Sequence, residues 1–286
     1  YAAGAWRRGR GEVQDERYAA GAWMQRVEQR KSSCRGATLL KALGAFCLAG
    51  SALADCPPPP GADTERVRLA SVTDGDSLRL QDGRRVRLMA VNAPELARDE
   101  HPAQPLGPEA RDGLQRFLAP GEPLFLVYGA QRKDHYGRSL AHVYTLEGEH
   151  LASYLVQRGL GFHIAVPPNL SLADCLARLE VEARRHERGV WGHGSWQPKA
   201  ARTLTSEDAG FARISGRVTR VDDQGDLWLE LDGPVVVSIQ ARDRARFDRP
   251  PEDWLGQSLT LRGWLVDRSS SRAAQKGFKP LLMPLR

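Results

Sequence analysis

Short runs in which apolar and polar residues alternate dominate the chain from about residue 64 onward. Alternation with a period of two is typical of half-buried β-strands, and a period near 3.6 is typical of amphipathic helices. The pattern predicts strands over Val67–Val72, Ser77–Gln81, Arg84–Val91, Leu124–Tyr128 and Arg138–Tyr144, and helices near Glu109–Leu118, Leu151–Arg158 and Leu172–Arg188. The first part of the chain is therefore expected to be β-rich, with its helices grouped after the strands.

The order of these elements predicts a fold class. Asp82-Gly83 separates two of the strands, and an Asp-Gly pair in that place predicts a tight β-hairpin. Three strands, a helix, two strands and two helices are typical of a small OB-type barrel with packed helices. We expect a β-rich α+β domain over residues 64–196.

A second β-rich unit is predicted over residues 211–286, and residues 197–210 are expected to be a linker. Its predicted strands are Ile214–Val221, Leu227–Leu231, Val235–Ile239, Ser258–Val266 and Phe278–Pro284, the arrangement of a second small OB-like barrel. Four arginines (Arg242, Arg244, Arg246 and Arg249) cluster near Phe247, and Trp228 and Trp264 are aromatic strand residues. They indicate either a nucleic-acid surface or ordinary solvated charges with core tryptophans.

The first 63 residues carry the features of an export signal. Basic residues precede an apolar run over 42–54 that ends in Ala52-Leu53-Ala54, the layout of a signal peptide. The peptide at residues 1–6 recurs at 18–23, directly before Met24, so we expect 1–23 to be a non-native or disordered extension and 24–54 to be the signal peptide. A Pro-rich spacer over 55–63 follows. We expect an exported protein, periplasmic or secreted, cleaved near Ala54.

Neither charge nor hydropathy identifies a partner for the folded part. The first 54 residues hold nine Lys or Arg and four Asp or Glu, so the remainder, with 32 and 31, is nearly neutral. The apolar run is shorter than the roughly 20 residues that span a bilayer, so no stable membrane span is expected. We expect a monomer.

Two of the four cysteines, Cys56 and Cys175, lie beyond the predicted signal peptide. In an oxidising compartment this pair is a candidate disulfide. Cys175 also follows helical spacing with apolar neighbours, which is typical of a buried thiol. Both alternatives stay open at the level of sequence.

Three charged motifs follow one another along the first domain. They are Asp74-Gly75-Asp76 in a turn, the run from Arg87 through Asn92 and Ala93 to Glu95, and the segment from Asp134 through Tyr136 to Arg138. In order and spacing, over residues 64–196, they resemble the staphylococcal nuclease (thermonuclease) family. Each motif alone is weak, but the series is specific.

The resemblance implies a Ca²⁺-dependent phosphodiesterase with roles for named residues. Asp76, the Asn92 side chain and the Ala93 carbonyl would bind the metal, with Asp74 behind them. Glu95 would act as the base for water, and Arg87 and Arg138 would bind the phosphate. The chemistry is consistent, because Ca²⁺ prefers oxygen ligands and guanidinium groups pair with phosphate oxygens.

Two departures from the family pattern leave alternatives. Asn92 stands where the best-known member has a carboxylate, and Ala93 where it has a threonine, so one ligand charge is missing. An amide oxygen still coordinates Ca²⁺ with weak affinity, which predicts either a weak-metal nuclease or a catalytically inactive nucleic-acid- or protein-binding module on the same fold.

The second departure concerns substrate contacts. The family's stacking tyrosines have no clear match, and Phe162 and His163 are the nearest candidates; His135 and Tyr136 are further candidates in an exposed loop. The resemblance predicts cutting of single-stranded or flexible DNA or RNA with little sequence preference. The seven histidines show no zinc-binding spacing.

Overall fold

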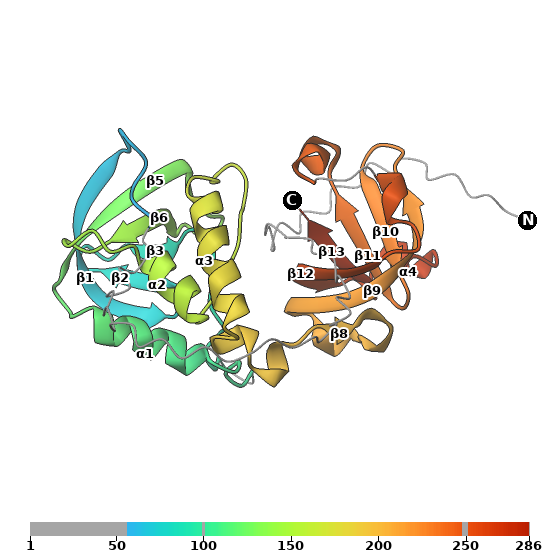
Figure 1. Cartoon of the computed structure of the whole chain (residues 1–286), viewed down its shortest axis with the longest axis horizontal. Coiled ribbons are helices and arrows are strands. Elements are labelled where there is room, and N and C mark those ends of the chain that lie inside the picture. The colour runs from blue at the N-terminus through green and yellow to red at the C-terminus, as the bar shows by residue number, and fades with distance from the viewer. Residues whose placement is uncertain (1–55, 99–100, 248–250, 286) are drawn as a thin grey trace, which may run out of the picture.

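The computed structural model describes residues 56–98, 101–247 and 251–285, which form two β-barrels that follow one another along the chain (Figure 1). The predicted extension and the signal peptide lie outside the described residues. Among the described residues, no helix combines the length and apolar character needed to cross a membrane.

The first barrel is closed in the order β1-β2-β3-β6-β5. Its strands are β1 (Thr64–Asp74), β2 (Ser77–Leu80), β3 (Arg85–Leu88), β5 (Pro123–Lys133) and β6 (Ser139–Tyr144). Leu78, Leu80, Val86 and Leu88 alternate with more exposed neighbours and face the core. This alternation is the pattern from which the strands were predicted, and the predicted barrel is confirmed.

Three helices pack around the first barrel: α1 (Gly107–Phe117), α2 (Leu151–Arg158) and α3 (Ala173–Arg185). Each buries an apolar stripe, as Leu114, Leu155 and Leu176 show with no exposed surface. A two-stranded sheet lies apart from the barrel and pairs β4 (Val91–Asn92) with β7 (Phe162–His163). This small sheet connects the end of β3 with the segment after α2.

The second barrel contains the strands predicted for it. They are β9 (Gly210–Asp222), β10 (Leu227–Leu231), β11 (Val235–Ile239), β12 (Ser258–Asp267) and β13 (Leu281–Leu285). The strand order is β10-β11-β13-β12-β9, and a β10–β9 pairing closes the ring. The remaining elements are short: η1 (Gly189–Trp191), η2 (Gly194–Trp196), β8 (Lys199–Ala200), η3 (Ala201–Thr203), η4 (Ser206–Asp208), η5 (Ala241–Arg246), η6 (Pro251–Trp254) and α4 (Arg272–Gln275).

The segment expected to be a linker is folded onto the second barrel. Lys199 and Ala200 pair in parallel with β9, and Ala201 and Leu204 are buried in the second core. The sequence gives little sign of this, because the stretch is short and mostly polar. Two of its apolar side chains complete a core whose other members lie farther along the chain.

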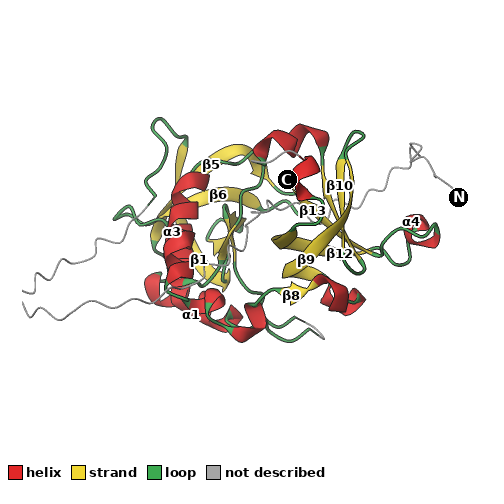
Figure 2. Ribbon diagram, turned by 45° about the vertical axis from the view of Figure 1, so that its right-hand side comes forward, coloured by secondary structure: helices red, strands yellow, loops and turns green. Residues whose placement is uncertain are grey.

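Aromatic residues join the two barrels. Phe162 packs edge-on against Trp191 and Trp196, each at a ring-centroid distance of 5.2 Å, and lies 5.1 Å from Phe211 of β9. Phe211 in turn lies 4.8 Å from Trp264 of β12. Figures 1 and 2 show β9 and β12 on the side of the second barrel that faces α3.

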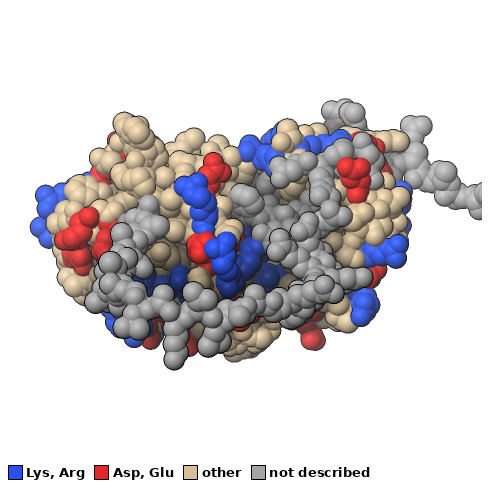
Figure 3. Space-filling model, in the orientation of Figure 1, with Lys and Arg blue, Asp and Glu red and all other residues tan. Residues whose placement is uncertain are grey.

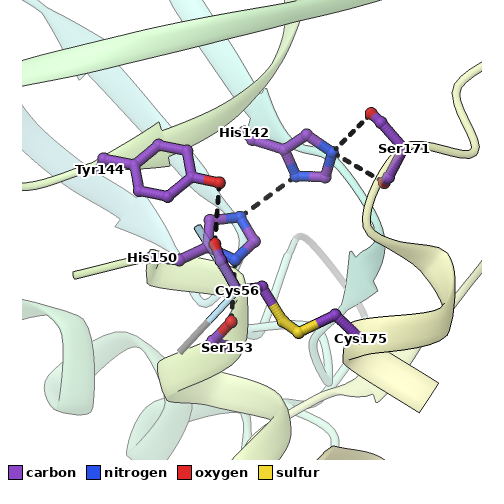
Figure 4. The surroundings of a disulfide bond; sticks show 7 residues. All are labelled: Cys56, His142, Tyr144, His150, Ser153, Ser171 and Cys175. Carbon is purple, nitrogen blue, oxygen red and sulfur yellow. Dashed lines mark hydrogen bonds between the residues drawn. A yellow bond between two sulfur atoms is a disulfide. The ribbon is translucent and has the colours of Figure 1, made fainter. Parts of the chain in front are cut away.

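Cys56 and Cys175 form a disulfide, one of the two alternatives that the sequence left open (Figure 4). The bond ties the start of the described chain to α3, at a Cα–Cα distance of 5.9 Å. Such bonds persist in oxidising compartments, which indicates an extracytoplasmic protein.

Two buried histidines lie beside the disulfide. His142 Nδ1 and His150 Nε2 share a hydrogen bond of 3.1 Å, and His150 Nδ1 bonds Ser153 Oγ at 2.9 Å (Figure 4). The Tyr144 hydroxyl, next to His150, donates to the Cys56 carbonyl at 3.0 Å. Burial lowers the pKa of His142 to about 4. Burial also lowers the pKa of His150, and the charge of His142 adds to the effect.

Candidate functional site

The Asp74-Gly75-Asp76 turn joins β1 to β2 and packs against two other elements. A Cβ atom at Gly75 would lie 2.6 Å from the Ala93 Cβ and 2.7 Å from the Ala110 Cβ. Nonbonded carbons do not approach so closely, so glycine is required for the turn to lie against α1 and the residue after β4. The sequence Asp-Gly-Asp thereby brings Asp76 next to Ala93.

The Asp76 carboxylate is buried, with 4% of the residue exposed. Ala93 N donates to its Oδ2 at 2.9 Å, and Ser77 Oγ donates to its Oδ1 at 3.1 Å. Arg87 Nη1 lies 2.7 Å from Oδ2. Burial raises the pKa of Asp76, and the Arg87 charge and the Ala93 N–H oppose that shift.

Arg87 brings Asp76 and Asn92 together. Besides its contact with Asp76, Nη1 donates to the Val91 carbonyl at 3.0 Å, and Nη2 donates to Asn92 Oδ1 at 3.0 Å. Asn92 is itself buried. A carboxylate oxygen and an amide oxygen from different elements thus converge on one positive charge.

Glu95 and Asp74 form the outer part of the site and share Arg98. Arg98 Nη2 donates to Asp74 Oδ2 at 2.7 Å and lies 3.2 Å from Glu95 Oε2. Burial, followed by the charges of Asp76 and Asp74, raises the pKa of Glu95, whereas Arg98 and Arg87 lower it. A carboxylate with a raised pKa is suited to accept a proton.

Sequence reasoning missed Arg98. The residue lies in a loop, its side chain is mostly exposed, and it belongs to none of the three motifs. A basic residue three positions after Glu95 carries no specific meaning in a sequence, because such pairs are common on surfaces. Only the approach of Asp74 from another element gives Arg98 two carboxylate partners.

Arg138 lies on the same side of the sheet as Arg87. The register of β3 and β6 pairs Val86 with Ser139 and Arg87 with Leu140, so Arg138 lies just before the paired segment, beside Arg85. Cross-strand neighbours share a face, so Arg85, Arg87 and Arg138 project outward together. In this structure Arg138 Nε donates to Asp134 Oδ2 at 2.6 Å.

The loop before Arg138 exposes two aromatic rings. The rings of His135 and Tyr136 lie 3.7 Å apart, and Tyr136 is 51% exposed. The Arg138 guanidinium lies 5.5 Å from the Tyr136 ring centroid, and Arg85 Nη2 donates to the Tyr136 carbonyl at 3.0 Å. Both residues are exposed, and their contact with a substrate stays a prediction.

Phe162 and His163, the other two candidate substrate contacts, are buried. Both are 0% exposed, since Phe162 is enclosed by the aromatic residues between the barrels and His163 packs between β4 and α3. His163 Nδ1 bonds the Ala90 carbonyl at 2.9 Å. Burial removes both rings from any surface that a substrate could reach, which corrects the expectation that they contact it.

Of the four arginines near Phe247, Arg244 and Arg246 are tied into local contacts, and Arg249 lies outside the described residues. Arg246 Nε donates to Asp243 Oδ1 at 3.2 Å, and Arg244 Nη1 donates to the carbonyls of Asp223 and Gly225. On the face drawn in Figure 3, basic and acidic side chains are interspersed over both barrels. These contacts favour ordinary solvated charges over a nucleic-acid surface in this segment.

The donor chemistry of the site fits a hard cation. Its oxygen groups are the Asp76 carboxylate and the Asn92 amide oxygen at the centre and the carboxylates of Asp74 and Glu95 around them, and oxygen ligands are those that Ca²⁺ takes. Within the described part of the chain, no three His, Cys, Asp or Glu side chains are grouped to hold a metal ion. A cation bound here would therefore depend on Asn92, backbone oxygen and water as well as on carboxylates.

Comparisons with known proteins agree with this geometry. Residues 85–193 match the family described as "Staphylococcal nuclease homologue". The chain is 30% identical over 135 residues to the thermonuclease of Staphylococcus hyicus, which covers 46% of this chain and 79% of that protein. It is 32% identical over 130 residues to the thermonuclease of Staphylococcus intermedius, covering 44% and 76%.

A third relative comes from another group of bacteria. The chain is 30% identical over 127 residues to an uncharacterized endonuclease of Escherichia coli O157:H7, covering 43% of this chain and 75% of that protein. The family match ends at residue 193, before β9, so it does not include the second barrel.

Proposed function

Because the chain belongs to the staphylococcal nuclease family, we propose that it is a Ca²⁺-dependent nuclease that hydrolyses phosphodiester bonds of DNA or RNA with little sequence preference. The observation that carries the proposal is the convergence of Asp76 and Asn92 on the Arg87 guanidinium, with Glu95 close by. Oxygen groups that converge from different elements are the ligands that Ca²⁺ takes.

The residues take roles that follow from their chemistry. Asp76, Asn92 and the Ala93 carbonyl would hold the ion, and the ion when bound would polarise a phosphoryl oxygen. Glu95 takes a proton from the attacking water, and its raised pKa suits that task. Asp74 fixes Arg98 beside Glu95.

Arg87 and Arg138 bind the phosphate from one face of the sheet. Their planar guanidinium groups donate paired hydrogen bonds to phosphate oxygens and offset the negative charge that grows in the transition state. Arg138 is held by Asp134 through one nitrogen, Nε, which leaves its terminal amino groups for a phosphate. His135 and Tyr136 then offer rings on which an unpaired base stacks without regard to its identity.

The cellular setting follows from the disulfide and from the sequence. We propose that the protein is exported, to the periplasm or the medium, after cleavage near Ala54, and that it acts as a monomer on single-stranded or flexible nucleic acid. Extracellular calcium sites commonly work at about 10⁻⁴ to 10⁻³ M, a range that tolerates the neutral ligand Asn92.

The test is hydrolysis of denatured DNA and of RNA with Ca²⁺ titrated. Glu95→Gln and Arg138→Ala should each lower kcat, the former by about 10²- to 10⁴-fold. Glu147→Gln, an exposed acid in the turn after β6, serves as the matched control and should cut at the wild-type rate. Circular dichroism should show that all variants fold.

Absence of cutting at millimolar Ca²⁺, with nucleic acid still retained, would overturn the proposal. It would favour the alternative that Asn92 suggests, a catalytically inactive binding module on the same fold. Failure to retain nucleic acid as well would point to a protein partner.

A further inference from the structure

Arg262 is buried although it lies on the outer face of its own barrel. Leu261 and Leu265 of β12 face the second core, so Arg262 and Trp264 lie on the opposite face. Arginine in that position is ordinarily solvated, but Arg262 is only 4% exposed. The first domain covers it: the Arg262 guanidinium lies 5.5 Å from the ring centroid of Trp191.

The partner of Arg262 is Glu180 of α3, 82 positions earlier in the chain. Arg262 Nη1 donates to Glu180 Oε1 at 2.7 Å, and Nη2 donates to Oε2 at 3.1 Å. Burial acts to raise the pKa of Glu180, but the charge and hydrogen bonds of Arg262, with the charges of His163 and Arg184, outweigh it, so the pKa lies below its ordinary value. Arg184 Nη2 lies 3.2 Å from Glu180 Oε2. The two form a buried ion pair between the domains.

This ion pair also holds the backbone of β7. His163 N donates to Glu180 Oε1 at 2.8 Å, and Arg262 Nη2 donates to the His163 carbonyl at 2.7 Å. Both backbone groups of His163 point away from β4, and a buried edge strand must find partners for such groups. Glu180 and Arg262 supply them in place of a further strand.

The opposite edge of β7 supports the proposed metal site. Asn92 pairs with Phe162 and Val91 with His163, and Ile164 N donates to the Ala90 carbonyl at 3.1 Å. β4 has only two residues, and β7 pairs with its backbone on the side opposite to Arg87, which holds the Val91 carbonyl and the Asn92 side chain. A line of contacts thus runs from the second barrel through β7 to Asn92.

We infer that the second barrel positions the nuclease site: Arg262, together with Glu180, clamps β7 and thereby holds β4 and the Asn92 side chain in place. Arg262 is a positioning residue, since it acts through His163 and touches neither substrate nor metal. The effect on Asn92 as a ligand rests on the proposed function, whereas the effect on the pairing of β4 with β7 is independent of it.

The experiment compares three variants of the full chain. Arg262→Met keeps an unbranched apolar stem and removes the charged head, and Arg262→Lys keeps the charge but has no fork to reach three acceptors. Leu229→Ala, in the core of the second barrel, is the control that destabilises this barrel without touching the clamp. Should Arg262→Met leave Glu180 too costly to bury, the double variant Arg262→Met/Glu180→Gln removes both charges.

Two measurements test whether β4 stays in place. Hydrogen–deuterium exchange follows the amides of residues 90–93 and 162–164, and the rise of Tm with added Ca²⁺ gives the apparent affinity for the metal. Arg262→Met should speed exchange in both segments and weaken Ca²⁺ binding about tenfold, as loss of a ligand's supporting contact commonly does. It should lower kcat with little change in KM for DNA, and Arg262→Lys should recover part of each effect.

The control variant Leu229→Ala distinguishes a loss of positioning at β4 from a general loss of stability. Leu229→Ala should lower Tm without changing exchange at 90–93 or the affinity for Ca²⁺. If Arg262→Met lowers Tm in the same way and leaves both readouts unchanged, the ion pair only docks the domains and the inference fails. If the wild-type protein neither binds Ca²⁺ nor cuts, but Arg262→Met still speeds exchange in β4, the clamp stands and the proposed nuclease function fails.

Discussion

Arg87 and Asn92 lie five positions apart and meet where β4 ends, with Arg87 Nη2 donating to Asn92 Oδ1 at 3.0 Å. The amide oxygen is therefore already held toward the cationic centre of the site, next to Asp76. A neutral ligand in this position keeps the geometry of the donor set and lowers its total negative charge. Calcium affinity depends on that charge.

Asn92→Asp should raise the affinity for Ca²⁺ about tenfold, because it adds a ligand charge. Without Ca²⁺ the same variant should melt at a lower temperature than the wild type, because a second buried carboxylate then faces Asp76. Calorimetric Tm values across a Ca²⁺ titration measure both effects. A variant whose Tm responds to Ca²⁺ as the wild type does would show that Asn92 is not a ligand.

Gly75→Ala should lower the free energy of unfolding by roughly 1–3 kcal/mol, as overpacking commonly does. The added Cβ would collide with Ala93 and Ala110, and the shift of the turn should also weaken Ca²⁺ binding. Gly194→Ala is the matched control, because a Cβ there meets nothing within 4 Å. Urea unfolding of both variants checks the difference, and equal midpoints would contradict the tight packing of the turn.

Stability should fall as the pH drops from about 6.5 toward 4. In the folded protein the pKa of His142 is lowered from its ordinary value of 6.5 to about 4. Between these two pH values the unfolded chain therefore binds a proton at His142 and the folded chain does not, so acid favours the unfolded state. The loss from this residue amounts to roughly 3 kcal/mol when the pH reaches 4. Urea unfolding at several pH values measures it, and His142→Gln should flatten the dependence. An equally steep dependence in that variant would assign the effect to other groups.

Loss of the disulfide should destabilise the protein by roughly 2–5 kcal/mol, because the bond closes a long loop in the unfolded chain. Its two cysteines are 119 positions apart. The variant Cys56→Ala/Cys175→Ala should therefore unfold at lower urea concentration than the oxidised wild type. Reductant should lower the midpoint of the wild type and leave the variant unchanged; a response in the variant would indicate that the reductant acts by another route.

Most strands of both barrels could be predicted from the sequence because they alternate apolar and polar residues over four or more positions, whereas β11 and β13 are short, nearly continuous apolar runs. The sheet formed by β4 and β7 could not, since two residues show no period. The structure places Asp76 and Arg87 in contact and Glu95 nearby, and the roles predicted for them stay predictions. The prediction that Phe162 and His163 contact the substrate was wrong, because residues far along the chain cover both side chains. A local sequence pattern gives no information about such long-range burial.

Arg262 and Glu180 also had no signal in the sequence. An arginine at an outward strand position and a glutamate in a helix are ordinary surface residues until two domains meet over them. Trp264 was left open between a core residue and a stacking platform. It packs on Phe211 in the contact between the barrels, so it is neither a core residue of its own barrel nor an open stacking surface.

The clamp on β7 sets an evolutionary constraint. A chain that carries the barrel leaves a buried charge with too few partners if it loses either member of the pair, because Glu180 would keep only Arg184 and the His163 N–H, and Arg262 would lose its carboxylate. Among descendants of this two-barrel architecture, the residues at 180 and 262 should change together or not at all. The second barrel would thus be inherited as part of the first domain's structure and not as a separable cassette.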